Sequence, residues 1–207
     1  MKIKAEGQRL DVREKILLEA TRLFGDRGFG GVALRDIAAA CEIPLSTLSS
    51  HFALKRDLQE VVFRRSVEII IKRDLTSRLG TGTPKQRFRR YLENVVELAL
   101  SDLPEMKLIN REFQELDKPE TFDIVVRAFG DRPAMDSLMF VADLAKETKS
   151  DILKSIPAVR FIQIVFASIY GIAKLGVVHR HVVGARAVSK AAITRDVILM
   201  FERMLRI

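Results

Sequence analysis

Residues 33–58 have the types and the spacing of a segment that could read DNA. Their apolar residues recur at helical intervals in two short stretches, which are joined by a tight turn and followed by the start of a longer helix. Two short helices that meet at a sharp angle can place the second helix in the major groove of DNA. The sequence therefore predicts a DNA-binding head in this part of the chain.

The charge of the chain is unevenly distributed. The 207 residues carry a formal net charge of +8, which favours anionic partners, and an apolar content of 48%, which is enough for a core. Residues 64–90 hold nine basic and two acidic side chains, whereas residues 1–63 and 91–207 are close to neutral. The basic excess therefore lies beyond the expected DNA-reading helix.

Helical periodicity continues through the rest of the chain, and no alternating strand pattern competes with it. A first helix is expected from Val12 to Phe24, ending in the glycine-rich segment 25–31. Later helices are expected over 56–79, 84–99, 158–178 and 185–207, and further ones after Pro104, Pro119 and Pro133. The predicted fold is all-α, with a three-helix head (residues 1–54) that contains a helix-turn-helix, followed by a helical body (residues 55–207).

Other classes of protein find little support. The single cysteine, Cys41, excludes an intramolecular disulfide framework and fits a reducing cytoplasm. Arg160 and Lys174 leave only 13 uncharged residues between them, fewer than the roughly 20 apolar residues that span a bilayer. No signal for export opens the chain. We expect a cytoplasmic protein without a membrane segment.

Catalytic and metal chemistry are not expected either. His179 and His181 lie two residues apart, so on a helix they point to different faces and have no nearby cysteine as a third ligand. Cys41 has no evident base, and no phosphate-binding or dinucleotide fingerprint is present. The sequence predicts no catalytic residues, no metal site and no cofactor.

The amino-terminal part resembles the DNA-binding domain of the TetR family of transcriptional regulators over about residues 10–60. The matching residues, at the spacing of the family, are Ile16-Leu17, Ala20, Leu23-Phe24, Gly28-Phe29, Arg35-Asp36-Ile37-Ala38, Thr47-Leu48, Phe52, Lys55 and Leu58. Any one of these elements alone would be a weak signal, but the combination is specific. The resemblance implies a ligand-responsive regulator, most often a repressor, that binds a palindromic operator as a homodimer.

The resemblance also implies which residues contact DNA. A recognition helix over about 44–50 would direct its polar side chains outward while Leu48 and Phe52 pack inward. Lys55 matches the family lysine that grips a phosphate. Thr47 and His51 are further phosphate candidates, against a structural hydroxyl and a packed or capping histidine as the alternatives. The predicted DNA-binding residues are Arg35, Leu45, Ser46, Thr47, Ser49, Ser50, His51 and Lys55.

Several contact positions depart from the family pattern. The family usually has hydroxyl residues at the positions of Val32 and Ala33, glycine at that of Glu42 and tyrosine at that of Ser49. Fewer phosphate contacts imply a modest affinity for the operator and a shallow salt dependence. The basic amino-terminal arm could add contacts to DNA, although a frayed terminus is the simpler interpretation.

The resemblance further implies that the body (residues 55–207) binds an effector and forms a homodimer. Residues 158–178 are apolar on nearly all sides. Pairing of this helix with the helix over 185–207 across a two-fold axis would bury it in a four-helix arrangement. The alternative is that it forms the central helix of a monomeric core. An apolar or amphipathic small molecule is the predicted effector. The candidate ligand-binding residues, which could equally be ordinary core, are Tyr91, Asn94, Phe113, Phe122, Phe129, Met139, Gln163, Phe166 and Tyr170.

The basic segment 64–90 has two interpretations. Its arginines could receive an anionic group of the effector, or they could form a solvated face that pairs with the acidic stretch 112–120. Two other functions also remain open: a ligand-binding or interaction module whose head has lost affinity for DNA, and a small-molecule enzyme built in the body. Binding to the DNA that flanks its own gene would separate a regulator from the first, and a turnover assay would test the second.

Overall fold

The computed structural model describes residues 11–206 except 79–80, 130–132, 149 and 183–188, and within helices it describes only the backbone of residues 74–78, 129, 133–138 and 173–182. The described residues form helices and no strand, which confirms the predicted all-α class. The helices are α1 (Val12–Arg27), α2 (Leu34–Ala40), α3 (Leu45–His51), α4 (Lys55–Arg78), α5 (Pro84–Ala99), α6 (Pro104–Gln114), α7 (Pro119–Phe129), α8 (Pro133–Glu147), α9 (Asp151–Ser155), α10 (Ala158–Val182) and α11 (Lys190–Leu205).

Proline and capping residues determine where many of these helices begin. Proline is the first residue of α5, α6, α7 and α8, as predicted, because its missing N–H has no intrahelical acceptor at that position. Thr83 caps α5 by accepting the N–H of Gln86, whose side chain accepts the N–H of Thr83 in return. Ser150 and Ser189 accept amides in the first turns of α9 and α11.

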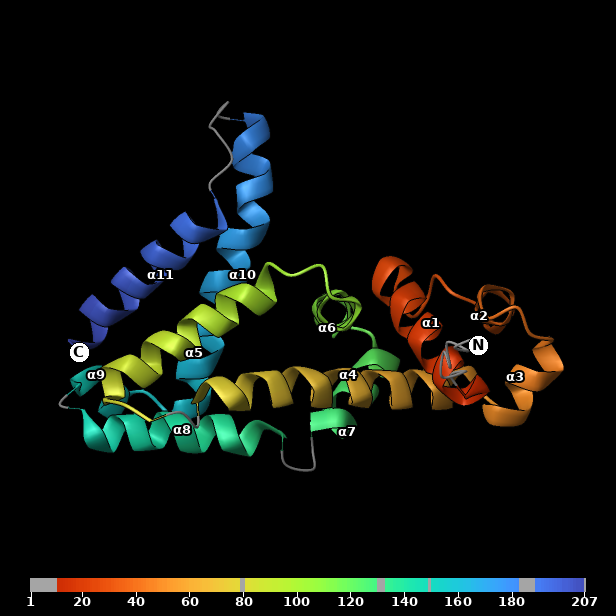
Figure 1. Cartoon of the computed structure of the whole chain (residues 1–207), viewed down its shortest axis with the longest axis horizontal. Coiled ribbons are helices and arrows are strands. Elements are labelled where there is room, and N and C mark those ends of the chain that lie inside the picture. The colour runs from red at the N-terminus through yellow and green to blue at the C-terminus, as the bar shows by residue number, and fades with distance from the viewer. Residues whose placement is uncertain (1–10, 79–80, 130–132, 149, 183–188, 207) are drawn as a thin grey trace, which may run out of the picture.

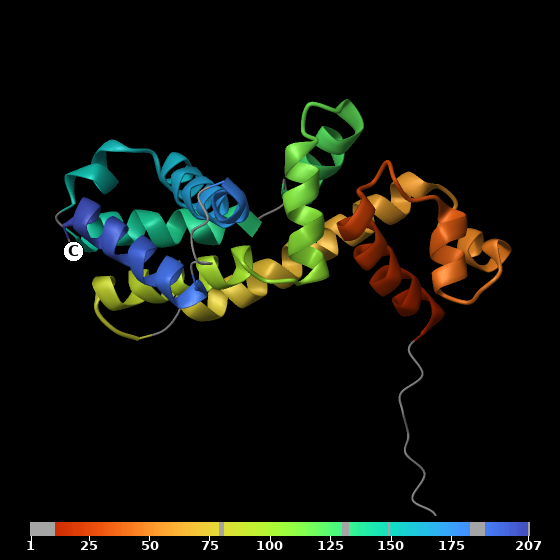
Figure 2. The ribbon, with the colours of Figure 1, turned by 90° about the horizontal axis from the view of Figure 1, so that it is seen from above.

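Two hydrophobic cores organise the molecule. The first combines α1 to α4 with α6 and α7, so the head shares its core with two helices of the predicted body. The second combines α5 with α8 to α11. Helix α4 is long and reaches from α1–α3 at one end toward α5 and α8 at the other (Figure 1). Helix α6 lies across α4 and beside α1, and it contacts both (Figures 1 and 2).

The structure corrects several predicted helix boundaries. Helix α1 continues past Gly25 to Arg27, and the last helix begins at Lys190 rather than near residue 185. Helix α10 continues to Val182, and the short helix α9 was not predicted. The predicted domain boundary between residues 54 and 55 falls where α4 begins and stays a prediction.

Over residues 158–172, whose side chains the structure describes, helix α10 is buried on one side. Phe161, Val165 and Ile169 lie in the second core, whereas apolar side chains on other faces of the helix are exposed. None of the helices described is long and apolar enough to cross a membrane.

Candidate nucleic-acid interface and effector site

The first three helices form the predicted helix-turn-helix head. Leu48 of α3 is completely buried against α1 and α2, and Phe52 is buried directly after α3. The guanidinium of Arg13 lies 5.2 Å from the centre of the Phe52 ring. Cys41 at the end of α2 is also buried, and burial raises the pKa of its thiol. These contacts hold α3 at a fixed angle to α2.

The turn between α2 and α3 contains one unusual backbone conformation. Glu42 has a φ of 54°, in the left-handed region that favours glycine. The amide of Glu42 donates to the carbonyl of Ala39 at 3.0 Å, and that of Ile43 donates to the carbonyl of Ala38 at 3.1 Å. This geometry explains why glycine suits the position of Glu42, which departs from the TetR pattern.

Helix α3 presents the predicted recognition residues to solvent. Leu45, Ser46, Ser49, Ser50 and His51 are exposed. Thr47 is half-buried, and its carbonyl accepts a hydrogen bond from the Ser50 hydroxyl at 2.7 Å, while Arg35 on α2 is exposed beside Asp36. Lys55 is half-buried at the first residue of α4, where the amides of the first turn have no intrahelical acceptor. The short outward side chains of α3 can reach base edges or phosphates only at close approach.

Val32 and Ala33, which depart from the TetR pattern just before α2, have different structural outcomes. Val32 is buried in the core of the head, so an apolar side chain fits its position. Ala33 occupies the N-cap position of α2 and has no side chain that could accept a hydrogen bond. Its own N–H donates to the carboxylate of Asp36 at 2.8 Å. One half of a capping box therefore remains and the other half is lost.

Many side chains of the basic segment 64–90 are paired with acids. Arg64 pairs with Glu60 in the same helix, and Arg65 pairs with Glu14 of α1. The remaining pairs join α5 to other helices or to the preceding turn: Arg87 with Glu147, Arg89 and Lys85 with Glu202, and Arg90 with the carbonyl of Thr81. These arginines therefore form a paired face, but their acids lie outside the predicted stretch 112–120.

Of the predicted effector residues whose side chains the structure describes, none lines either of the two cavities described below. Tyr91 is buried in the second core and Asn94 is half-buried. Phe113, Phe122, Met139, Gln163 and Phe166 are exposed, Tyr170 is half-buried, and the side chain of Phe129 lies outside the described residues. The Tyr170 hydroxyl accepts a hydrogen bond from the side chain of Gln114 at 2.6 Å, which links α10 to α6.

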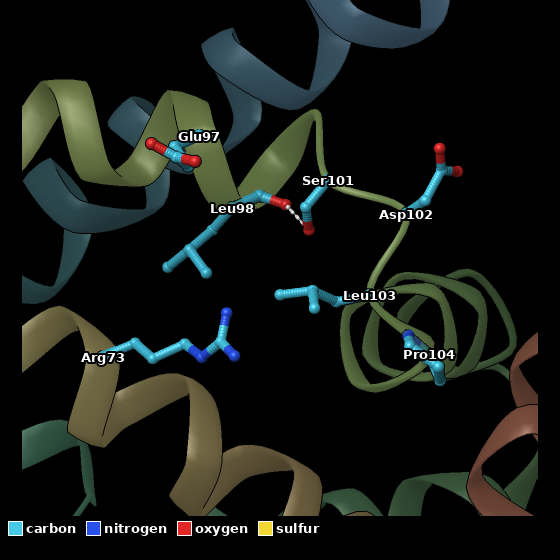
Figure 3. A pocket seen from close by; sticks show the side chains of 7 residues that line it. All are labelled: Arg73, Glu97, Leu98, Ser101, Asp102, Leu103 and Pro104. Atoms are coloured by element: carbon cyan, nitrogen blue, oxygen red, sulfur yellow. Dashed lines mark hydrogen bonds between the residues drawn. The ribbon is translucent and has the colours of Figure 1, made fainter.

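A cavity of about 400 Å³ lies between α4 and the turn that connects α5 to α6. The guanidinium of Arg73 points from α4 toward Leu98 and Leu103, which form an apolar wall (Figure 3). On the opposite side, the Ser101 hydroxyl donates to the carbonyl of Leu98 at 2.7 Å. The lining also includes Glu97 and Asp102, whose carboxylates pair with Lys190 and Lys107. The cavity therefore combines one cation of the basic segment and two paired acids with an apolar surface.

A second cavity, of about 480 Å³, lies where the head meets α6 and α7. Its most unusual residue is Glu112 of α6, whose side chain is 1% exposed. The carboxylate accepts the N–H of Phe29 at 3.0 Å, across the junction between body and head. Burial raises the pKa of Glu112 to about 7, although the hydrogen bond from Phe29 acts in the opposite direction.

Sequence reasoning missed the role of Glu112. Phe113, a predicted ligand-binding residue, is exposed, whereas the neighbouring Glu112 is buried. A signal was present, because Glu112 lies three residues after Ile109 and six after Met106, on the face that a helix buries. Among the described residues, no three histidine, cysteine, aspartate or glutamate side chains are arranged to hold a metal ion.

Comparisons with known proteins agree with the head geometry. Residues 16–62 match the model of bacterial regulatory proteins of the tetR family. The HTH-type transcriptional repressor DhaR of Mycobacterium sp. (strain GP1) is 29% identical over 91 residues, which are 43% of this chain and 46% of that protein. The match thus spans less than half of the length of this curated relative.

Solved structures are similar over nearly the whole chain. The crystal structure of AibR in complex with isovaleryl coenzyme A and operator DNA has a TM-score of 0.68 and 18% identity, and covers 92% of this chain and 97% of that chain. A transcriptional regulator from Saccharomonospora viridis in complex with choline has a TM-score of 0.66 and 22% identity, with 92% and 95% covered. At these identities the likeness concerns the fold. Residues 16–62 therefore match the DNA-binding domain of the tetR family of bacterial regulatory proteins, and the chain as a whole is similar in fold to these solved regulators.

Proposed function

We propose that this protein represses transcription by binding a palindromic operator as a homodimer, and that a small molecule releases it from DNA in the cytoplasm. The observation that carries this proposal is the outward face of α3, where five of the predicted contact residues are exposed while Leu48 and Phe52 hold the helix in place. An exposed second helix of a helix-turn-helix can enter the major groove. DhaR, which matches part of the chain, is named a transcriptional repressor.

An exposed apolar surface on α10 and α11 supports dimerisation. Its large side chains are Val159, Ile164, Phe166, Ile172, Leu199 and Met200. Apolar side chains that are exposed in a single subunit can mark an interface. Gly171 leaves open space beside α10, since nothing lies within 4 Å of the position that a Cβ would occupy. A palindromic operator requires the two copies of α3 in the dimer to lie about 34–36 Å apart, the spacing of successive major grooves.

The effector is inferred from the cavity at Arg73. Similar folds bind small molecules, because the structures of AibR and of the S. viridis regulator contain isovaleryl coenzyme A and choline. In this chain, the cavity of about 400 Å³ combines the Arg73 guanidinium with Leu98 and Leu103, and its two acids, Glu97 and Asp102, are paired with lysines outside the lining. We infer an amphipathic effector whose anionic group is received by Arg73. Mass spectrometry of ligand retained by the purified protein tests this class directly.

Fluorescence anisotropy with DNA that flanks its own gene tests the proposed function. Saturable binding that exceeds binding to unrelated DNA, together with a two-subunit mass in solution, is expected. Lys55→Ala should weaken binding at all sequences and reduce the slope of log affinity against log salt by about 1. Lys107→Ala is the matched control, because Lys107 is an exposed lysine on α6 that pairs with Asp102.

Failure to bind any of that DNA at low salt would overturn the proposed function. The ligand-binding module with a weakened head would then be favoured by a specific observation, the missing side-chain cap at Ala33. No catalytic role is proposed. Turnover of the retained ligand by the purified protein would contradict that assignment.

A further inference from the structure

The junction between the head and α6 contains a titratable group that the proposed function does not use. Glu112 is almost completely buried in the body helix α6, and its carboxylate accepts the backbone N–H of Phe29 in the head. Gly28, with a φ of 74°, lies so close to α6 that an added Cβ would be 3.0 Å from Cδ of Arg111. The carboxyl is therefore enclosed by the contact between the two parts.

The charged groups around Glu112 do not neutralise it fully. On α6, Arg111 directs its guanidinium to the carbonyls of Gly25 and Asp26, at 3.1 and 2.8 Å. Glu115 is a like charge, and it pairs with Lys118 in the turn that follows. The other charged residues that line the cavity are Arg27 of α1, Lys55 and Arg56 of α4, and Glu120 of α7.

Arg56 is paired as well, because it contacts Asp123 of α7 at 3.1 Å. The direct contact that the structure describes for the Glu112 carboxylate is thus a neutral amide rather than a cation. Keeping a buried carboxylate ionised without a paired cation is unfavourable.

We propose that Glu112 is a proton-dependent switch at the head–body junction: protonation stabilises the closed contact between Phe29 and α6, and ionisation favours its opening. In the open form water would surround the carboxyl and restore its ordinary acidity. The closed form therefore binds the proton more tightly, and proton binding must shift the equilibrium toward it. The pKa of about 7 in the closed form places the change near neutral pH.

The direction and size of the effect follow from this linkage. Glutamate has an ordinary pKa of 4.5, so only the closed form holds the proton between pH 4.5 and about 7. Raising the pH through this range favours the open form, and above pH 7 the effect levels off. Between pH 6 and pH 8 the equilibrium constant for opening should rise about tenfold.

Hydrogen exchange at the Phe29 amide measures this opening in the full-length protein. After correction for the intrinsic rate, the protection of this amide should fall about tenfold from pH 6 to pH 8. Glu112→Gln keeps an oxygen that accepts the Phe29 amide but cannot ionise, so its protection should be independent of pH and should exceed that of the parent protein at pH 8. Glu115→Gln is the matched control on the same helix and should retain the parent pH dependence.

Equal pH dependence in the parent protein and Glu112→Gln would overturn the switch. The carbon-13 shift of the Glu112 carboxyl in the parent protein gives a second measurement that needs no variant. A midpoint near pH 7 is expected, and a midpoint near 4.5 in the folded protein would also overturn the proposal.

The consequence for DNA rests on the proposed function, whereas the opening of the junction does not. Because the head carries α3, the operator affinity of the parent protein should change between pH 6 and pH 8. Glu112→Gln should abolish the part of this change that comes from the junction. If no variant binds the flanking DNA, the proposed function fails while exchange at Phe29 still decides the switch. If DNA binds and the pH dependence is unchanged by Glu112→Gln, the switch fails and the proposed function stands.

Discussion

Glu42 combines an unfavourable backbone conformation with little compensation from its side chain. Its φ of 54° brings the Cβ of an L-residue close to the following carbonyl, which glycine avoids. The carboxylate is 3.9 Å from the ammonium of Lys15, but both groups are exposed, and exposed pairs contribute little. The helix-turn-helix thus keeps its shape in spite of this residue.

Glu42→Gly should therefore stabilise the head. Relief of the left-handed strain is expected to exceed the added chain entropy of glycine in the unfolded state, with a net gain of about 0.5–1 kcal/mol. Urea unfolding at pH 7 measures the difference. Glu42→Ala removes the pair with Lys15 and keeps the strain, so it should not be more stable than the parent protein.

At the scale of single residues, the sequence predicted that a helix has a buried face more reliably than it predicted which residues lie on that face. Leu48 and Phe52 are buried as predicted from their helical spacing. Phe113 is exposed although it belongs to an apolar stripe, because α6 turns the neighbouring Glu112 toward the amide of Phe29. That amide lies 83 residues away in the chain, and no local pattern contains it.

The helices themselves were predictable where their start signals are strong. Pro84, Pro104, Pro119 and Pro133 each begin a helix, as their fixed φ and missing N–H predict. Helix α9 has five residues, too few for an amphipathic period to show. Helix α1 continues through Gly25 because tertiary packing outweighs the low helix propensity of glycine.

Gly25 is required by the contact between α1 and α6. An added Cβ would lie 2.9 Å from the backbone oxygen of Pro104, which cannot move aside as a flexible side chain would. Gly25→Ala should thus destabilise the protein by about 1–3 kcal/mol, although alanine favours helices. Thermal unfolding is the measurement, and Gly30→Ala, with open space around its Cβ position, should be nearly neutral.

The amino terminus of α2 can be strengthened. Ala33 already has an extended backbone, with φ of −95° and ψ of 157°, that suits an N-cap residue. Ala33→Ser would supply the missing acceptor for an amide of the first turn, while Asp36 retains its bond to the residue 33 amide. A gain of about 1 kcal/mol in unfolding free energy is expected. Thr83→Ala at the cap of α5 should cost a similar amount, and equal stability of both variants to the parent would contradict this account.

Across the whole molecule, four of the nine basic side chains of segment 64–90 pair with distant acids, namely Arg65, Lys85, Arg87 and Arg89. Arg65 and Glu14 are 51 residues apart, and Arg89 and Glu202 are 113 residues apart. Counting charges along the sequence located the excess correctly but could not identify these partners. Only the packing of α5 against α8 and α11, and of α4 against α1, brings them together.

The proposed dimer predicts a specific sensitivity to charge on α10 and α11. Phe166→Glu or Leu199→Glu would place a carboxylate in the expected interface and should convert the dimer to monomers, as measured by light scattering. Operator affinity should fall with it, because one head would then bind without its partner. Val126→Glu on α7 is the matched control, since Val126 is about as exposed as Leu199 but lies outside α10 and α11.

A dimeric parent protein that remains dimeric in both α10 and α11 variants would show that another surface joins the subunits. Loss of the dimer in Val126→Glu alone would place that surface on α7. Circular dichroism of each variant would establish whether its helices remain formed.

The position of Cys41 gives the head a natural chemical reporter. This thiol is the only one in the chain, and it lies in the core between α1, α2 and α3. An alkylating reagent can therefore reach it only when the three helices separate. The rate at which the unmodified protein is alkylated thus measures how often the three helices separate. No engineered label is needed, and no second thiol contributes to the signal.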